Sequence, residues 1–309
     1  MKPQWIIENN VFQDGTSERM GEIAKSRGMK VLHVDSDWVH GRKFGGSNFI
    51  HAHECAVFYG SMNMARKLLR ENAWTPTAWF NLKTLACTDY YANWGQYLLQ
   101  QDYLMMPWAE MKRKKEFLYA KMSDRHPYAP EKIFLRPNSN TKLFTGTVLE
   151  RDEFEHFIKM TDECYTPDPE TLVIVARVQD ISDEWRFIVS EGKVLTGSYY
   201  GKNSDGAAIS INIDNYENRQ EVAARNLALK IAKEQWQPDI IYALDICAIR
   251  SGGPSNKMFG PSCKLLEIGS VNTAAMYGCN LEIVVDKVSE LAEKEHADNN
   301  IEIPQSIIK

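Results

Sequence analysis

The chain has 309 residues, of which 44% are hydrophobic and 25% charged, the balance of an ordinary globular protein with one or two domains. Its net charge of −5 argues against a protein that coats nucleic acid, because it offers no broad basic surface for phosphate contacts. The start of the chain lacks the pattern of a signal peptide, and no run approaches the ~18 apolar residues that span a bilayer. The six cysteines contain no CxxC pair, which indicates reduced thiols. We therefore expect a cytoplasmic protein without a membrane partner.

The opening segment has a pattern typical of alternating strands and helices. Residues 5–7 (WII), 30–35 (KVLHVD) and 55–60 (CAVFYG) are predicted to form strands. Ser17 is predicted to cap a helix that stops at Gly28, and a second helical pattern follows the third strand. This order predicts a βαβ unit within a parallel sheet covered by helices.

Residues 73–125 carry two features with both a structural and a functional interpretation. The stretch 111–122 (MKRKKEFLYAKM) predicts a basic helix, which is either a solvated face or a patch for nucleic acid or an acidic partner. The aromatic side chains between 74 and 108 would pack in a core or stack on nucleobases, and we favour packing. They are Trp74, Trp79, Tyr90, Tyr91, Trp94 and Trp108.

A third local pattern is the alternation of His51, His53 and Cys55, which would share one face of a strand. Such a set could bind zinc, but a fourth ligand at suitable spacing is absent. We therefore favour a polar strand edge.

After Pro130 the pattern changes to short apolar runs that predict strands. Glu191-Gly192 separates two of them and predicts a tight hairpin turn. The change of pattern divides the chain into an α/β region, 1–125, and an α+β region, 126–309. The predicted strands are 132–137, 171–178, 184–190, 193–200, 239–249 and 263–269, and helical patterns lie at 217–236 and 282–296.

Arg136 ends the run IFLRP and precedes a polar loop, 138–146, that contains Lys142. A cation fixed on a strand and a second cation on a loop suit polyphosphate binding, because the loop can cover the phosphates and exclude water. An arginine before a proline at a strand end also serves purely structural roles.

Glu184 and Arg186 flank Trp185, so in a strand both side chains point to one face. They would form a surface ion pair, or they would bind a ligand. In the second case Glu184 accepts from a ribose hydroxyl, and Arg186 binds a phosphate or a substrate carboxylate.

Asp245 and Glu267 lie inside two apolar strands joined by a glycine-rich connection. If these strands pair, the two carboxylates approach and repel unless a cation lies between them. Magnesium prefers oxygen ligands together with nucleotide phosphates, and the amide of Asn272 would add a third oxygen. Two structural acids in apolar strands are the alternative.

The ordered segments FLRP-x5-LFTG, VIVARVQDISDEWRF, GKVLTGSYY, ALDIC and LLEIG-x-x-N-x-x-x-x-Y resemble an ATP-grasp domain, in particular the R2K clade, a group common in bacteriophage genomes. With the upstream segment VFYGSMNMARKLLRENAWTPTAWFN, the resemblance covers roughly residues 55–290. It implies a pre-ATP-grasp βαβ domain followed by two α+β subdomains that hold ATP between them. A phage-encoded member would act in the host cytoplasm.

The resemblance also implies roles for individual residues in binding ATP and Mg²⁺. One departure concerns the last motif, usually Glu-x-Asn, because Gly269 stands two positions after Glu267; Asn272 would then supply the oxygen. The implied roles are phosphate binding for Arg136 and Lys142, adenine binding for the backbone of Ala176, Arg177 and Val178, ribose binding for Glu184, contact with the transferred phosphoryl group for Arg186, and magnesium binding for Asp245, Glu267 and Asn272.

The implied reaction is phosphorylation of a carboxylate by ATP, followed by attack of an amine on the acyl-phosphate. The acid and amine would be small molecules or peptides, with Lys202 and Asn203 either lining the acceptor pocket or lying in an exposed turn. One alternative is a non-catalytic module that binds nucleotide or peptide. Another is a nucleic-acid-modifying enzyme that uses the basic helix.

Overall fold

The structure is a computed structural model whose backbone groups into two compact units. In the described part of the chain, no helix combines the length and the apolar character needed to cross a membrane. The first unit comprises residues 1–81, 183–246 and 267–309, and the second comprises 82–182 and 247–266. The described residues are 1–12, 14–37, 54–122, 131–139, 143–202, 206–215, 219–250 and 262–301.

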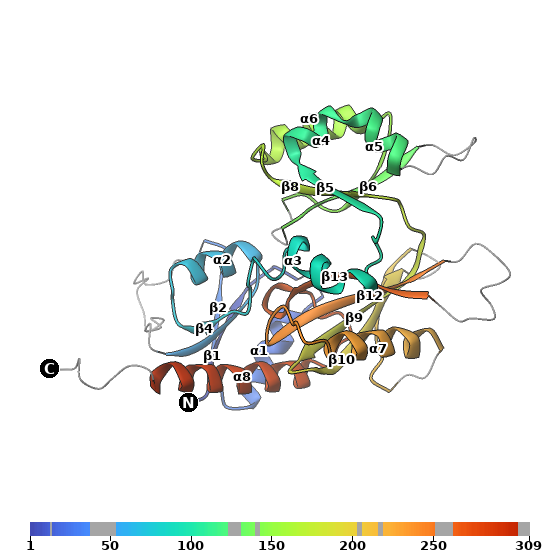
Figure 1. The fold of residues 1–309 in the computed structure, drawn as a ribbon. Coiled ribbons are helices and arrows are strands. Elements are labelled where there is room, and N and C mark those ends of the chain that lie inside the picture. The colour runs from blue at the N-terminus through green and yellow to red at the C-terminus, as the bar shows by residue number, and fades with distance from the viewer. Residues whose placement is uncertain are drawn as a thin grey trace. The chain divides into compact units, whose positions relative to one another are not determined.

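The first unit contains a four-stranded parallel sheet with the order β2-β1-β3-β4 (Figure 1). Its helices α1 and α2 follow β1 and β3 in the chain, which confirms the predicted βαβ arrangement. The strands are β1 (Gln4–Glu8), β2 (Val31–Val34), β3 (Cys55–Tyr59) and β4 (Thr75–Thr77), and the helices are α1 (Thr16–Ser26) and α2 (Met62–Arg70).

The start of α1 differs from the prediction by two residues. Gly15 precedes the helix with a φ of 72°, a left-handed conformation that suits glycine, and Asp14 Oδ1 accepts from the Thr16 amide at 3.0 Å. Ser17 therefore lies buried in the first turn and does not cap the helix. The predicted stop at Gly28 is confirmed, because α1 ends at Ser26 and Gly28 has a φ of 75°.

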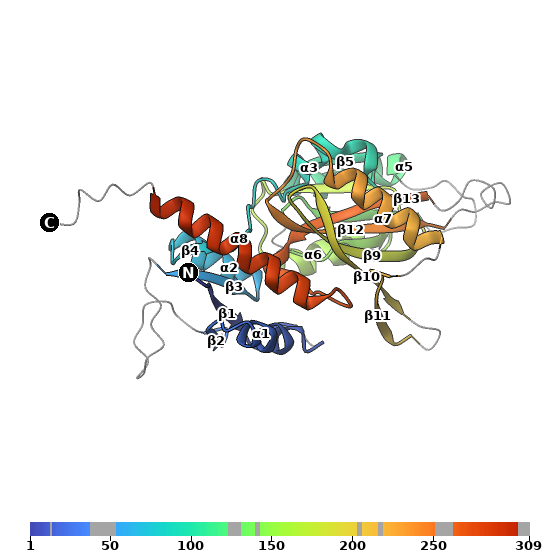
Figure 2. The same cartoon turned by 90° about the horizontal axis from the view of Figure 1, so that it is seen from below.

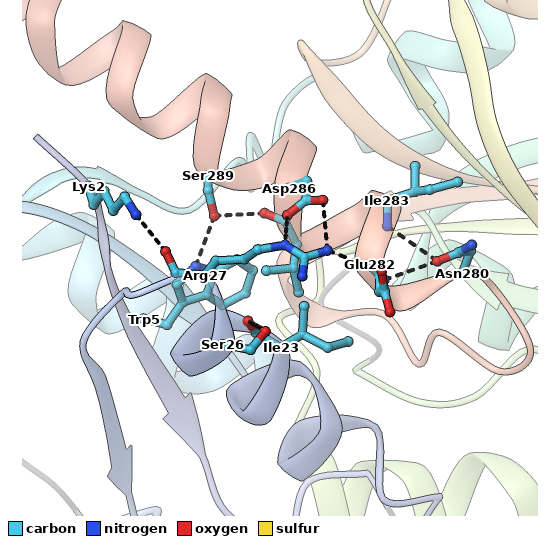
Figure 3. A network of polar contacts seen from close by, with 11 residues as sticks. Lys2, Trp5, Ile23, Ser26, Arg27, Asn280, Glu282, Ile283, Asp286 and Ser289 are labelled. Carbon is cyan, nitrogen blue, oxygen red and sulfur yellow. Dashed lines mark hydrogen bonds and ion pairs between the residues drawn. The ribbon is translucent and has the colours of Figure 1, made fainter.

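The last described helix, α8 (Leu281–Ile301), packs against α1, β3 and β4 (Figure 2). Arg27, just after α1, pairs with Glu282 at 3.1 Å and Asp286 at 3.0 Å (Figure 3). Trp5 Nε1 of β1 donates to Ser289 Oγ at 3.1 Å. Residues from both ends of the chain thus share one core. The strand and helix patterns could not show which sheet the last helix covers.

A five-stranded sheet has the order β11-β10-β9-β12-β13. The Glu191-Gly192 turn joins β9 to β10 with φ values of 48° and 75°, both positive as a type I′ hairpin requires, and this confirms the predicted hairpin. Helix α7 (Arg219–Ala232) packs against β10. The strands are β9 (Ile181–Ser190), β10 (Lys193–Lys202), β11 (Ala208–Asn212), β12 (Ile241–Ile249) and β13 (Ser262–Ser270).

The second unit contains an antiparallel sheet with the order β5-β8-β6-β7, and helices α4, α5 and α6 pack over it (Figure 1). The predicted basic helix 111–122 is instead divided between α4 and α5 at Lys114. The elements are β5 (Tyr103–Pro107), β6 (Lys132–Pro137), β7 (Thr147–Glu150), β8 (Leu172–Ala176), α3 (Cys87–Trp94), α4 (Trp108–Arg113), α5 (Lys115–Met122) and α6 (Phe154–Tyr165). Two short 3₁₀ helices, Gly95–Tyr97 and Val271–Thr273, complete the described secondary structure.

Candidate active site

Arg186 and Asp245 form a buried, two-pronged ion pair between the neighbouring strands β9 and β12. Arg186 Nε donates to Asp245 Oδ1 at 2.8 Å, and Nη2 donates to Oδ2 at 2.6 Å. The two residues are only 9% and 3% exposed. The cation expected beside the buried Asp245 carboxylate is therefore supplied, at least in part, by the chain itself.

The Arg186 guanidinium has further contacts that fix its plane. Its Nη1 donates to the Ala275 carbonyl at 2.7 Å, and its carbon lies 4.9 Å from the centre of the Tyr277 ring and 5.9 Å from that of Tyr200. Burial alone would lower the pKa of Arg186, but the charge and hydrogen bonds of Asp245 raise it well above its ordinary value. Arg186 is thus a permanently charged group in a fixed position.

Glu184 shares a strand face with Arg186, as the spacing of two predicted, and accepts from the Tyr200 hydroxyl at 2.9 Å. Burial raises the pKa of Glu184, and the negative charges of Asp245 and Glu267 raise it further. The Tyr200 hydrogen bond and Arg186 oppose this shift. Glu184 therefore lies within the electrostatic influence of two other carboxylates, which fits the binding of an added cation.

Glu267 lies half-buried on β13, the neighbour of β12, so it and Asp245 occupy adjacent strands as predicted. Within the described ranges, no three His, Cys, Asp or Glu side chains lie close enough to hold a metal ion by themselves. Magnesium commonly takes one or two carboxylates and completes its shell with nucleotide phosphates and water. The donor set of Asp245 and Glu267 fits that mode of binding.

Asn272 does not support the metal-binding role expected for it. Its Oδ1 accepts from the Trp79 amide at 2.9 Å, and its Nδ2 donates to the Phe58 carbonyl at 2.7 Å. Its own carbonyl accepts from the Gly60 amide at 3.0 Å, and the residue is only 2% exposed. The side chain therefore joins the 3₁₀ turn after β13 to β3. The sequence spacing alone could not show the direction in which this turn points the amide.

Arg136, in the second unit, lies half-buried near the end of β6, where it pairs in register with Ile174 of β8. Burial raises the pKa of Tyr90 and Tyr91 of α3, and the positive charge of Arg136 opposes the shift for both. The expected phosphate-binding cation is therefore part of the same unit as this tyrosine pair.

Ala176 ends β8, and β9 begins only at residue 181, so Arg177 and Val178 of the predicted adenine-binding segment lie in the link between two sheets. Ala176 is buried, while Arg177 Nη2 approaches the Lys121 carbonyl at 3.5 Å. Val178 belongs to the same non-repetitive link. Its backbone groups are thus not engaged in a regular strand.

Tyr200 and Tyr277 were not identified as site residues from the sequence. Their rings stack with centroids 4.4 Å apart and an interplanar angle of 13°. Both tyrosines belong to quoted family segments, GSYY and the final Y of LLEIG-x-x-N-x-x-x-x-Y, but their distance along the chain hides the contact. Only the position of the segment after β13 brings them together.

Of the three residues of the zinc alternative, which we did not favour, the structure describes Cys55. This residue is buried in β3, and its Sγ donates to the Ala292 carbonyl at 3.4 Å. Burial raises the pKa of Cys55 to about 11, and its thiol is hydrogen-bonded to the main chain.

The basic stretch and the aromatic residues receive structural explanations. All six aromatic side chains named above are at most 5% exposed, which confirms core packing over base stacking. Three lysines of the basic stretch pair with acids, which weakens the interpretation as a polyanion site. These pairs are Lys112 with Asp162, Lys114 with Glu110 and Lys115 with Glu155.

Lys202 is exposed at the end of β10, so it is available to solvent. His51, His53, Lys142 and Asn203 lie outside the described residues.

Comparisons with solved structures reveal the same overall fold in ligases and synthetases. D-alanyl-alanine synthetase A from Vibrio cholerae is 9% identical, with a TM-score of 0.59 and coverage of 96% of this chain and 99% of its own. D-cycloserine synthetase DcsG is 14% identical, with a TM-score of 0.55 and coverage of 94% and 99%. The ATP-grasp ligase PsnB, complexed with a minimal precursor, is 12% identical, with a TM-score of 0.52 and coverage of 94% and 100%.

The TM-scores establish similarity of fold and agree with the predicted ATP-grasp architecture. A search of curated proteins finds no match. A sequence profile of the ATP-grasp domain, R2K clade family 2, matches residues 113–287, more than half of the chain. The chain therefore belongs to family 2 of the R2K clade of ATP-grasp domains.

Proposed function

We propose that the protein is a magnesium- and ATP-dependent ligase that joins a carboxylate to an amine and releases ADP and phosphate. Family membership and the names of the structural neighbours, two synthetases and a ligase, support this reaction class. The observation that carries the proposal is the grouping of one arginine and three acids on three neighbouring strands: Glu184, Arg186, Asp245 and Glu267. The charges of Asp245 and Glu267 raise the pKa of Glu184, and that of Arg186 lowers it.

In the proposed reaction, a carboxylate oxygen attacks the γ-phosphorus of ATP, and ADP leaves with the electrons of the broken P–O bond. The amine nitrogen then attacks the acyl carbon, phosphate leaves, and the nitrogen loses a proton as the amide forms. Catalysis consists of positioning and charge stabilisation, so no protein nucleophile is needed. Magnesium, when bound, would neutralise part of the phosphate charge.

Asp245 and Glu267 are the proposed magnesium ligands. Asp245 accepts from Arg186 through both of its oxygens, so its carboxylate would be shared between the guanidinium and the metal. Glu184 would accept from a ribose hydroxyl, and Arg186 would contact the transferred phosphoryl group. Asn272 is not included, because its amide already bonds to the main chain on both sides.

The second unit is proposed to supply the other contacts with ATP. Arg136, on β6, and Lys142, in the following loop, would bind phosphates, and the loop would exclude water from them. The backbone of Ala176, Arg177 and Val178 would bind adenine, as in the family resemblance. These assignments depend on the match of each position to the family segments.

Small molecules or peptides are the proposed acid and amine. The neighbour PsnB is described as complexed with a precursor, and a peptide acceptor is therefore included for this chain. We do not propose a nucleic-acid partner, since the net charge is −5 and the basic stretch is largely ion-paired. The proposed location is the cytoplasm, which supplies ATP.

One specific observation favours a second candidate, a non-catalytic nucleotide- or peptide-binding module. Gly269 occupies the position of the usual last Asn, and the nearby Asn272 amide is engaged elsewhere. A weakened metal site would permit ATP binding without turnover. The two candidates differ in whether an acceptor stimulates ADP release.

The test is ADP release from Mg-ATP in the presence of pooled amino acids, peptides and polyamines, with mass spectrometry of any new amide. Glu267→Gln should abolish release, while Glu170→Gln, the same change at an exposed carboxylate, should leave it unchanged. Release that requires an acceptor supports the ligase. Tight ATP binding with no release for any acceptor supports the binding module instead.

A further inference from the structure

Tyr277 has an unusual backbone conformation at the candidate active site. Its φ is 51°, in the left-handed region that side chains other than glycine and asparagine rarely adopt. Such a conformation persists only where surrounding contacts maintain it, and it is concentrated at functional sites. We therefore expect the contacts of the Tyr277 ring to maintain this backbone conformation.

The segment that contains Tyr277 contacts the Arg186 guanidinium at two points. The Ala275 carbonyl accepts from Nη1 at 2.7 Å, and the Tyr277 ring lies 4.9 Å from the guanidinium carbon. Tyr200 stacks against Tyr277 with centroids 4.4 Å apart. The stack limits the movement of the Tyr277 ring, so this ring and the carboxylate of Asp245 together restrict the plane of the guanidinium.

A count of the Arg186 hydrogen bonds shows what this orientation leaves available. A guanidinium has five N–H groups. Asp245 and Ala275 accept from three of them, so one N–H on Nη1 and one on Nη2 have no hydrogen-bond acceptor among the described residues. Arg186 is only 9% exposed, and buried N–H groups normally find an acceptor. A bound anionic oxygen, of a carboxylate or a phosphoryl group, fits these two donors.

We propose that Tyr277 is a positioning residue, whose ring holds Arg186 so that these two N–H groups face an oxygen of the reacting group. The identity of that oxygen rests on the proposed ligase function, whereas the orientation of Arg186 does not. The left-handed backbone of Tyr277 serves to place the ring over the guanidinium. Tyr277 itself acts only through Arg186.

Three substitutions separate the ring from the hydroxyl and from the backbone. Tyr277→Phe keeps the ring and removes only the hydroxyl. Tyr277→Gly removes the ring but favours the positive φ, so the backbone conformation is retained and folding is protected. Tyr200→Phe keeps the stacking ring and removes the hydrogen bond to Glu184, which makes it a matched control.

The first measurement follows the Arg186 Nε–H signal by NMR of protein with isotopically labelled arginine, assigned by its loss in Arg186→Lys. Wild type, Tyr277→Phe and Tyr200→Phe should exchange this proton slowly, and Tyr277→Gly should exchange it about tenfold faster. An unchanged exchange rate in Tyr277→Gly overturns the proposal. This readout needs no substrate and is independent of ligase activity.

The second measurement is ADP release by the same variants. Tyr277→Gly should lower kcat about tenfold with little change in the KM for ATP, and Tyr277→Phe should restore kcat. Faster proton exchange with unchanged kcat would show that the orientation has no role in the reaction and would overturn the proposal. If no variant, wild type included, releases ADP while the NMR pattern is as expected, the ligase proposal fails and the positioning of Arg186 is upheld.

Discussion

Arg186 donates to both carboxylate oxygens of Asp245, across 2.8 and 2.6 Å, in a part of the molecule that almost excludes solvent. The two residues are far apart in the chain but lie on neighbouring strands, β9 and β12. Removal of Asp245 would leave Arg186 as a buried charge without its counter-ion, and removal of Arg186 would take two charged hydrogen bonds from Asp245. Tests of catalysis at this position must therefore account for stability first.

Asp245→Asn should lower the free energy of unfolding by about 3–5 kcal/mol, because Arg186 then keeps a buried charge without its counter-ion. The double variant Asp245→Asn with Arg186→Met should lose less than the sum of the single effects, since the charge is gone as well. Urea denaturation of the three variants measures this coupling. Additive losses would contradict the account. For tests of activity, Glu267→Gln is expected to cost less stability than Asp245→Asn, because Glu267 is only half-buried.

Asn272→Ala should destabilise the protein by about 2–4 kcal/mol, because it leaves the Trp79 amide and the Phe58 carbonyl without their side-chain partners. The magnesium dependence of ATP binding should remain that of the wild type below the unfolding transition. Calorimetric titration of the folded variant with ATP, with and without magnesium, measures this dependence. A clear loss of magnesium affinity would show that Asn272 contributes to the metal site.

Gly60→Ala should destabilise the protein by about 1–3 kcal/mol. A Cβ at Gly60 would lie 2.5 Å from Glu8 Cβ and 2.7 Å from Phe58 Cζ, and buried Glu8 could not move without losing its bond from the Ser61 amide at 2.7 Å. Gly95→Ala is the matched control, since its Cβ would meet nothing within 4 Å. Thermal unfolding of the pair should show a lower Tm for Gly60→Ala alone, and equal Tm values would refute the packing argument.

Asp239→Asn should change the pH dependence of stability. Burial raises the pKa of Asp239 to about 6 from an ordinary 3.8, with Glu295 adding to the shift and main-chain hydrogen bonds opposing it. A raised carboxyl pKa favours the folded state below the unfolded pKa, and this benefit is lost as pH rises through the folded pKa. Between about pH 4 and pH 7, the variant should therefore gain about 2–3 kcal/mol relative to wild type. Urea midpoints at the two pH values measure the difference, and a constant difference would disprove the shift.

Much of the fold was predictable because its strands are marked by local patterns. The apolar runs at 171–178 and 239–249 became β8 and β12, and the Glu191-Gly192 hairpin follows from turn chemistry. β5 (Tyr103–Pro107) was missed because it is short and ends in proline, which weakens any strand pattern. The place of α8 against α1, β3 and β4 was also not predictable, since a helical pattern shows an apolar face but not the elements it contacts.

The candidate site was predictable in part, because some of its residues also follow a local strand pattern. The shared face of Glu184 and Arg186 follows from the strand period, and the register with Tyr200 and Ser198 confirms it. The partner of Arg186 was not predictable, because it depends on the order of strands and not on spacing along one strand. The direction of the Asn272 amide was likewise not predictable from spacing, because only the folded turn determines it.

The most direct test of the central claim is calorimetric binding of ATP to the full chain with and without magnesium, for wild type, Glu267→Gln and the exposed control Glu170→Gln. The account predicts magnesium-dependent binding to wild type and to Glu170→Gln, weakened at least about tenfold in Glu267→Gln through the loss of a charged metal ligand. Absence of ATP binding by wild type, or equal affinity of Glu267→Gln, would contradict it.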